Sequence, residues 1–231
     1  MTAVTAGSGS TISISRGVKI AGWAGVLWAV LSFARLPLTG EAEQPARAAA
    51  SDDIVGFFEG VGYDGLFVIG IGLVIIGWAL LPVFIARVAD LIGSTDRGLR
   101  WLGQVALAGA ILEVGLTVTY LAAIATGVFA ASHTGLGTDG YVLLHGMTWS
   151  LLWLDSILFA LWLVPLGTAI VAIRLFPRWL GWALIATGVG GVVAFFMSND
   201  ILVNVFGGLP YLWVLIAGIL LLVRSARYSQ P

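Results

Sequence analysis

The sequence has no cysteine, and only 10% of its 231 residues are charged. The lack of cysteine excludes disulfides, thiolate metal sites and cysteine nucleophiles. Average soluble domains carry about 25% charged residues, so the few charges present here cannot cover a water-exposed globule. A formal net charge of −1 also provides no basic surface for nucleic acid. These absences argue against a soluble domain and against a nucleic-acid partner.

Apolar residues are what the sequence has in excess. They make up 59% of the chain, and the mean hydropathy is +1.02. A helix of about 20 apolar residues spans the roughly 30 Å of a bilayer core. Stretches of suitable length and composition lie at about 18–34, 65–86, 101–129, 142–173, 179–197 and 206–223. We therefore predict an all-α integral membrane bundle of six transmembrane helices, forming one domain over residues 16–228.

The basic residues predict how this bundle is oriented. Nine of the 11 lie before the first span, after the last span, or in the second and fourth connections. They are Arg16, Lys19, Arg87, Arg97, Arg100, Arg174, Arg178, Arg224 and Arg227. Only Arg35 and Arg47, in the first loop, lie on the opposite side. The positive-inside rule then places both termini in the cytoplasm. Residues 1–15 are mostly small and polar, so we predict a disordered cytoplasmic N-terminus.

Glycine and other small residues are abundant within the spans. The chain has 31 glycines, and small residues in membrane helices let two backbones approach closely. Ala183, Thr187 and Gly191 form such a face on the fifth span, with Gly188 beside it. We expect this face to pack against another helix. Glycine-rich faces also leave open a homo- or hetero-oligomer.

Two carboxylic acids lie deep within predicted spans. Glu113 in the third span and Asp155 in the fourth each lie roughly 18–20 Å along the helix from its nearer end. A short loop joins these spans, so the helices run antiparallel and the carboxyls can meet. An ionised carboxylate at mid-membrane costs at least about 2.5–3.5 kcal/mol, and the sequence predicts no deep basic residue as a partner. We expect at least one acid to be neutral, and we predict that Glu113 and Asp155 form a proton donor and acceptor pair.

Polar and aromatic side chains continue from these acids along the same two helices. The predicted ligand-binding residues are Thr117, Tyr120, His145, Trp149, Trp153 and Trp162. They predict a cavity between spans three and four whose mouth lies on the outer side, beside His145. The alternative is that the acids only form hydrogen bonds between helices and the indoles only pack. His133 has no companion ligands, so we predict no metal site and no cofactor.

The connection at residues 176–181, Phe-Pro-Arg-Trp-Leu-Gly, opens the glycine-rich fifth span. Proline starts the helix, arginine holds the cytoplasmic side and tryptophan anchors the interface. Together with the apolar run before it, this segment resembles an uncharacterised bacterial family of small multi-pass membrane proteins, catalogued as domain of unknown function 4386. The resemblance covers about residues 140–195. It implies a bacterial inner-membrane protein and carries no established activity.

The sequence leaves more than one function open. The first is a polytopic membrane protein in the lipid bilayer whose cavity binds an apolar or amphiphilic small molecule. The second is a membrane-embedded enzyme in which a protonated carboxylic acid drives isoprenoid cyclisation or isomerisation, by analogy with membrane terpene cyclases. The third is a proton-coupled transporter that uses Glu113 or Asp155 as the proton carrier. Whether the protein is an enzyme stays undecided at this level.

Overall fold

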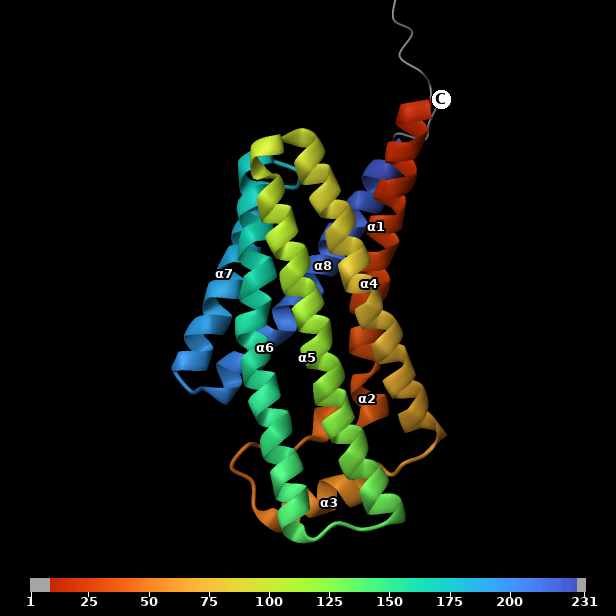
Figure 1. Ribbon diagram of the computed structural model, residues 1–231, viewed down its shortest axis with the longest axis vertical. Helices are drawn as coiled ribbons and strands as arrows, with labels where there is room; N and C mark the ends of the chain where they lie inside the picture. Colours follow the sequence, from red (N-terminus) through yellow and green to blue (C-terminus); the bar gives the residue numbers. More distant parts are fainter. Residues whose placement is uncertain (1–8, 228–231) are drawn as a thin grey trace, which may run out of the picture.

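Six long helices form the bundle in Figure 1, and all six are long and apolar enough to cross a membrane. They are α1 (Gly9–Ala34), α4 (Gly65–Thr95), α5 (Arg100–His133), α6 (Thr138–Ile173), α7 (Arg178–Phe196) and α8 (Asp200–Arg227). This computed structural model describes the backbone of residues 9–227 and the side chains of residues 16–41 and 43–225. It confirms the prediction of an all-α membrane protein with six spans.

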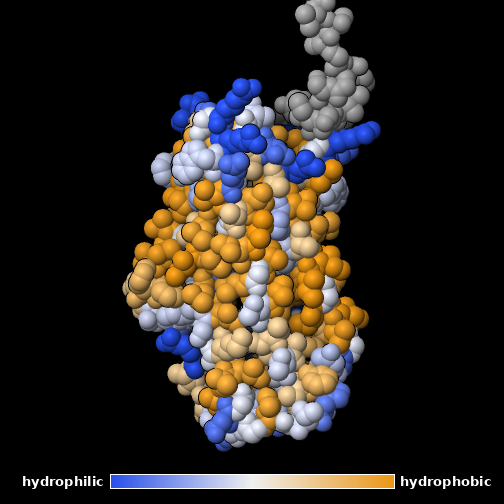
Figure 2. Space-filling view, viewed as in Figure 1, coloured by the Kyte–Doolittle hydropathy of each residue, from blue (hydrophilic) through white to orange (hydrophobic). Residues whose placement is uncertain are grey.

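The helices form because lipid provides no hydrogen-bond partner for the backbone, and an α-helix satisfies its own peptide groups. Polar residues mark several of the ends. Asp64 precedes α4 and accepts a hydrogen bond from the Phe67 amide at 2.9 Å, while α6 ends where Arg174 adopts a left-handed φ of 56°. Figure 2 shows the outcome on the surface, with an apolar belt around the middle and hydrophilic residues towards both ends.

The helices extend further than the predicted spans. Helix α4 continues to Thr95, and α8 begins at Asp200, because the helical backbone continues past the apolar stretch into more polar sequence. Helix α1 begins at Gly9, so the part of the predicted disordered segment from residue 9 onwards is helical. The remainder of that segment, residues 1–8, lies outside the described residues.

A cap of short elements lies at the end of the bundle opposite the start of α1 (Figure 1). We use this name for residues 35–61, which include α2 (Leu36–Thr39), η1 (Glu41–Glu43) and α3 (Ser51–Val61). Helix α3 packs against α5 and α6, and its buried Phe58 stacks on Tyr141 with ring centroids 5.5 Å apart. At the other end, η2 (Arg97–Leu99) joins α4 to α5. The cap therefore covers the end of the bundle that α5 and α6 build.

The glycine-rich face of α7 packs against α6 of the same chain. A Cβ atom on Gly167 of α6 would lie 2.5 Å from the Gly181 carbonyl oxygen, and one on Gly191 would lie 2.9 Å from the Ser156 carbonyl oxygen. Both distances are too short for a side chain, so glycine sets the separation of the two helices. The face of α7 that was predicted to pack against another helix therefore packs against a helix of the same chain. An oligomer stays a prediction.

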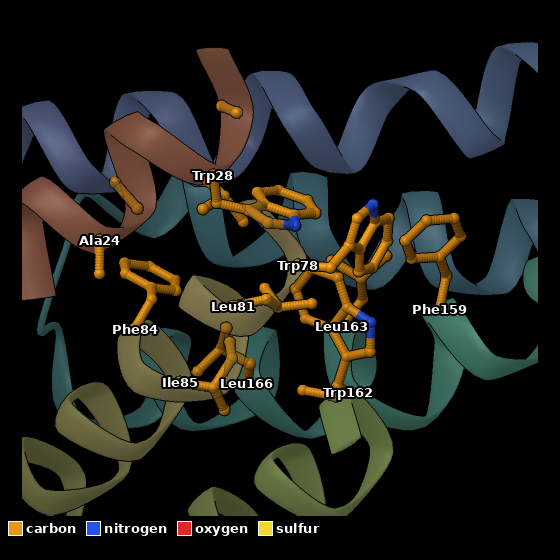
Figure 3. Packing of buried hydrophobic residues seen from close by; sticks show 14 of the residues in the cluster. Ala24, Trp28, Trp78, Leu81, Phe84, Ile85, Phe159, Trp162, Leu163 and Leu166 are labelled. Carbon is orange, nitrogen blue, oxygen red and sulfur yellow. The ribbon is translucent and has the colours of Figure 1, made fainter. Parts of the chain in front are cut away.

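Aromatic side chains fill the centre of the bundle, as Figure 3 shows. Trp28 of α1 packs edge-on against Trp78 of α4 and Trp162 of α6, with ring centroids 5.4 and 6.4 Å apart. All three indoles are at most 1% exposed. Tyr211 of α8 completes the cluster at 4.9 Å from Trp28. This aromatic core joins α1, α4, α6 and α8, and two of its rings, Trp78 and Tyr211, also line the cavity described below.

Candidate functional site

A cavity of about 370 Å³ lies beside the aromatic core. Helix α5 contributes Leu116, Thr117 and Tyr120 to its wall, and α6 contributes Trp149, Leu151, Leu152 and Asp155. The rest of the wall comes from α1, α4, α8 and the cap. Small-molecule sites are clefts of roughly 300–1,000 Å³ with mainly apolar walls and a few polar groups. The volume and the mixed wall both fall within that description.

The two acids predicted from the sequence lie next to each other. Asp155 lines the cavity, while Glu113 is fully buried behind it on α5. Their carboxyl groups are close enough to interact directly, because α5 and α6 are antiparallel neighbours. The contact is not a well-aligned hydrogen bond, since neither Glu113 oxygen has a hydrogen-bond partner among the described residues. Asp155 therefore connects the cavity wall to the second, fully buried carboxyl on α5.

Arg35 lines the same cavity as Asp155, although the sequence analysis predicts no basic residue near the two acids. The residue follows the end of α1, and it is 8% exposed and lines the cavity. Its Nη2 lies 3.2 Å from Oε2 of Glu41, and the Thr39 hydroxyl donates to the other Glu41 oxygen at 3.0 Å. The sequence analysis placed Arg35 in the first loop between spans, and the structure shows that Arg35 is buried there, next to α2 and η1. The apolar residues on both sides of Arg35 are the signal that indicates burial.

A chain of hydrogen bonds joins the cap to α5 and α6 over the cavity. The Tyr120 hydroxyl donates to Oε1 of Gln44 at 3.0 Å, and Nε2 of Gln44 donates to the Thr148 hydroxyl at 2.8 Å. The Trp149 indole N–H donates to the Pro45 carbonyl at 3.1 Å. These bonds use every polar group of the Gln44 side chain. The cap thus closes this side of the cavity.

The other predicted site residues lie outside the cavity wall. His145 is buried, and its Nε2 lies 3.1 Å from the Ala46 carbonyl oxygen, so the cap occupies the place where the mouth was expected. Trp153 packs beneath the Arg47 guanidinium at 4.3 Å, and Trp162 belongs to the aromatic core. Among the predicted residues, the structure brings together on the wall Thr117, Tyr120, Trp149 and Asp155.

The cavity reaches the surface between α1 and α8. The exposed members of its wall are Phe33 on α1 and Asn204 on α8. The two helices pack tightly further along, where a Cβ on Gly218 would lie 2.8 Å from the Gly22 carbonyl oxygen. They diverge towards the cap (Figure 1), and a Cβ on Gly207 of the cavity wall would meet no atom within 4 Å. We call this gap the lateral opening.

Several wall residues on α1, α4 and α8 were missed in the sequence analysis. They include Ser32, Trp78, Asn204, Gly207 and Tyr211. Nothing local in the sequence shows that the first and last helices are neighbours, so these residues could not be assigned to one site. Their chemistry complements the predicted wall with aromatic surface and hydrogen-bonding groups. In the part of the chain that the structure describes, no group of three or more His, Asp or Glu side chains could hold a metal ion.

Comparison with known proteins identifies the family. No curated protein and no solved structure matches the chain. A family model described as a domain of unknown function (DUF4386) matches residues 20–225, which covers all six spans rather than only the segment around the Pro-Arg-Trp-Leu-Gly connection. The chain therefore belongs to the DUF4386 family, as the resemblance in its sequence predicts.

Proposed function

We propose that this protein binds an apolar or amphiphilic small molecule in the cavity between α1, α5, α6, α8 and the cap. The observation that carries the proposal is a cavity of about 370 Å³ whose wall combines aromatic rings with buried polar groups inside an apolar bundle. Trp78, Tyr120 and Tyr211 provide ring surface, and Arg35 and Asp155 provide charge and hydrogen bonds. This is the composition of a site for a ligand with both apolar and polar parts.

The lateral opening supports a ligand that reaches the cavity from the membrane. Phe33, at the opening, is 46% exposed on the apolar surface of the bundle, and Gly207 leaves open space beside it. A molecule dissolved in the bilayer could pass between α1 and α8 without crossing the cap. A water-soluble solute would instead have to pass the hydrogen bonds of Gln44. We therefore favour an amphiphile that partitions into lipid.

We place the protein in a bacterial inner membrane with both termini in the cytoplasm. The basic residues that favour this orientation lie at the ends of α1, α4–α5, α6–α7 and α8 that share one side of the bundle (Figures 1 and 2). The cap then faces outward. Fusing a reporter that is active only in the cytoplasm to either terminus should give signal, whereas a fusion within the cap should not.

Filling the cavity should abolish binding. Replacing Gly207 with Phe adds a ring to the wall at a position where a Cβ would meet no atom within 4 Å. We expect the affinity for an environment-sensitive fluorescent fatty-chain probe to fall at least about tenfold, since a blocked site loses roughly 1.4 kcal/mol or more of binding free energy. Fluorescence titration of the purified protein in a neutral, sugar-headed detergent measures this affinity.

Gly115 provides the matched control. It lies on an exposed face of α5, and a Cβ there also meets no atom within 4 Å. Gly115→Phe should therefore bind the probe like the unmodified protein. If Gly207→Phe folds and keeps the unmodified affinity, the cavity is not the binding site and the proposal fails.

The position of Asp155 on the wall with Glu113 behind it favours proton chemistry as a second candidate. A protonated Asp155 could donate to a bound molecule, as in an enzyme, or Asp155 could carry protons in a coupled transporter. Either activity should be lost in Asp155→Asn, which keeps the size of the side chain but cannot exchange a proton. Probe binding should remain within about threefold, because the hydrogen-bonding shape is kept.

Two assays separate these activities. Proton-gradient-driven uptake of the probe into liposomes tests transport, and turnover of an isoprenoid extract tests catalysis. Glu113→Gln should reduce whichever activity Asp155→Asn removes, because the two carboxyls interact. If neither assay gives a signal that depends on these two residues, the proton-chemistry candidate is wrong. Binding of a small molecule in the cavity is then the proposed function that remains.

A further inference from the structure

Three residues of the cavity wall carry buried hydrogen-bond donors without acceptors. Nε and Nη1 of Arg35, the Ser32 hydroxyl and the Trp78 indole N–H are buried and have no hydrogen-bond partner among the described residues. All three residues line the cavity, and each is at least nine-tenths buried. More than about 90% of buried polar groups in proteins have partners, because a group without one costs free energy. A group of such donors at one cavity therefore indicates an acceptor supplied by a ligand.

The Arg35 side chain is held by contacts that use only part of it. Glu41 pairs with Nη2, the Thr39 hydroxyl in turn donates to Glu41, and the Thr39 backbone N–H donates to the Arg35 carbonyl oxygen. These contacts fix the guanidinium before any ligand arrives, which lowers the entropy cost of binding. The remaining Nε–H and Nη1–H groups point in different directions, and each can donate a charge-assisted hydrogen bond to a carboxylate or phosphate oxygen.

The rest of the cavity matches an apolar chain attached to such a head group. Leu116, Leu152 and Val203 provide apolar wall, and Gly207 and Phe33 lead to the lateral opening. A head group at Arg35 would therefore leave its chain pointing towards lipid. The polar end would be enclosed by the cap, and the apolar end would remain in a hydrophobic environment.

We infer that the cavity selects amphiphiles with an oxyanion head group, a carboxylate or a phosphate, which Arg35, Ser32 and Trp78 bind as donors. The inference rests on the proposed function and narrows the class of its ligand. Asp155 lies in the same wall, and its ionised form would oppose an oxyanion through its charge. Removing that charge in Asp155→Asn should accordingly leave oxyanion affinity unchanged or increase it.

The test compares three ligands with the same chain, namely dodecanoate, dodecyl phosphate and dodecanol. Each displaces the fluorescent probe from the purified protein in a sugar-headed detergent. We expect at least one oxyanion to bind about tenfold or more tightly than dodecanol, since hydrogen bonds to ionised groups are roughly twice as strong as neutral ones. The ranking of the two oxyanions then shows whether the natural head group is a carboxylate or a phosphate.

The variant Arg35→Gln/Glu41→Gln removes both charges of the buried pair, so no uncompensated charge remains. It should bind all three ligands within about threefold of one another, because the charge-assisted bonds are lost. Arg47→Gln provides the control, since Arg47 is an arginine of the cap whose guanidinium packs on Trp153 outside the cavity wall. This control should keep the preference for oxyanions.

The outcomes separate the inference from the function on which it rests. If unmodified protein binds dodecanol as tightly as both oxyanions, or if the double variant keeps the preference, the head-group inference is overturned while the cavity remains a binding site. If no ligand displaces the probe and Gly207→Phe also leaves probe binding unchanged, the proposed function itself fails.

Discussion

Replacing Arg35 alone with Gln is expected to lower the free energy of unfolding by about 3–5 kcal/mol. The reason is the partner that the change leaves behind. The Glu41 side chain is 5% exposed, and without Arg35 its carboxylate would be buried with the Thr39 hydroxyl as its remaining hydrogen-bond partner. The double variant Arg35→Gln/Glu41→Gln should recover most of the loss, because removing both members of a buried pair is often nearly neutral. Unfolding in mixed micelles with increasing denaturing detergent measures both changes in the free energy of unfolding.

A surface ion pair provides the matched comparison. Arg87 and Asp90 lie 3.4 Å apart on α4, but their side chains are 49% and 72% exposed. Arg87→Gln should therefore cost less than about 1 kcal/mol. If Arg35→Gln costs no more than Arg87→Gln, the Arg35–Glu41 pair is solvated, and the cap does not enclose the cavity as described.

Trp162→Ala is expected to destabilise the bundle by about 3–5 kcal/mol. The indole is fully buried against Trp28 and Phe159, and truncation would leave a hole that rigid helices cannot close. The loss of contacts counts in a membrane protein as well, because van der Waals packing drives helix association there. The quantity to measure is the change in the midpoint temperature of thermal unfolding, monitored by tryptophan fluorescence.

Trp182 is the control for this change. It lies in α7 and is 59% exposed on the apolar surface, so Trp182→Ala should shift the midpoint much less. The comparison also decides the role of Trp162, which the sequence analysis assigned to a ligand site. A Trp162→Ala variant that is as stable as Trp182→Ala but binds the probe weakly would restore that assignment and contradict the packing role.

The features predicted correctly from the sequence depend on local patterns. Apolar stretches long enough to cross a bilayer predict the six helices without knowledge of their neighbours. The short loop between α5 and α6 makes them antiparallel, and this alone brings Glu113 and Asp155 to similar depth. The family resemblance was read from one connection, and the family model extends it over residues 20–225.

The features that were missed depend on contacts between distant parts of the chain. Gln44 bonds to Thr148 across 104 positions, and no periodic pattern in either segment indicates such a contact. Apolar helices in a membrane also give little signal about which face points inward, because lipid and core are both apolar. For this reason Trp149 at the cavity and Trp162 in the aromatic core look alike in the sequence. Arg35 was misplaced because a charged residue directly after an apolar span is ordinarily assigned to a water-exposed loop when hydropathy is the only guide.

The most direct test is an experimental density map of the protein purified in lipid nanodiscs from cells that produce it. We expect elongated density inside the cavity, with its compact end beside Arg35 and its tail towards the lateral opening at Phe33 and Gly207. The Gly207→Phe protein, imaged in the same way, should lack this density and keep the same bundle. A map of the unmodified protein in which the wall side chains close the cavity, leaving no room for a ligand, would contradict the proposed binding function.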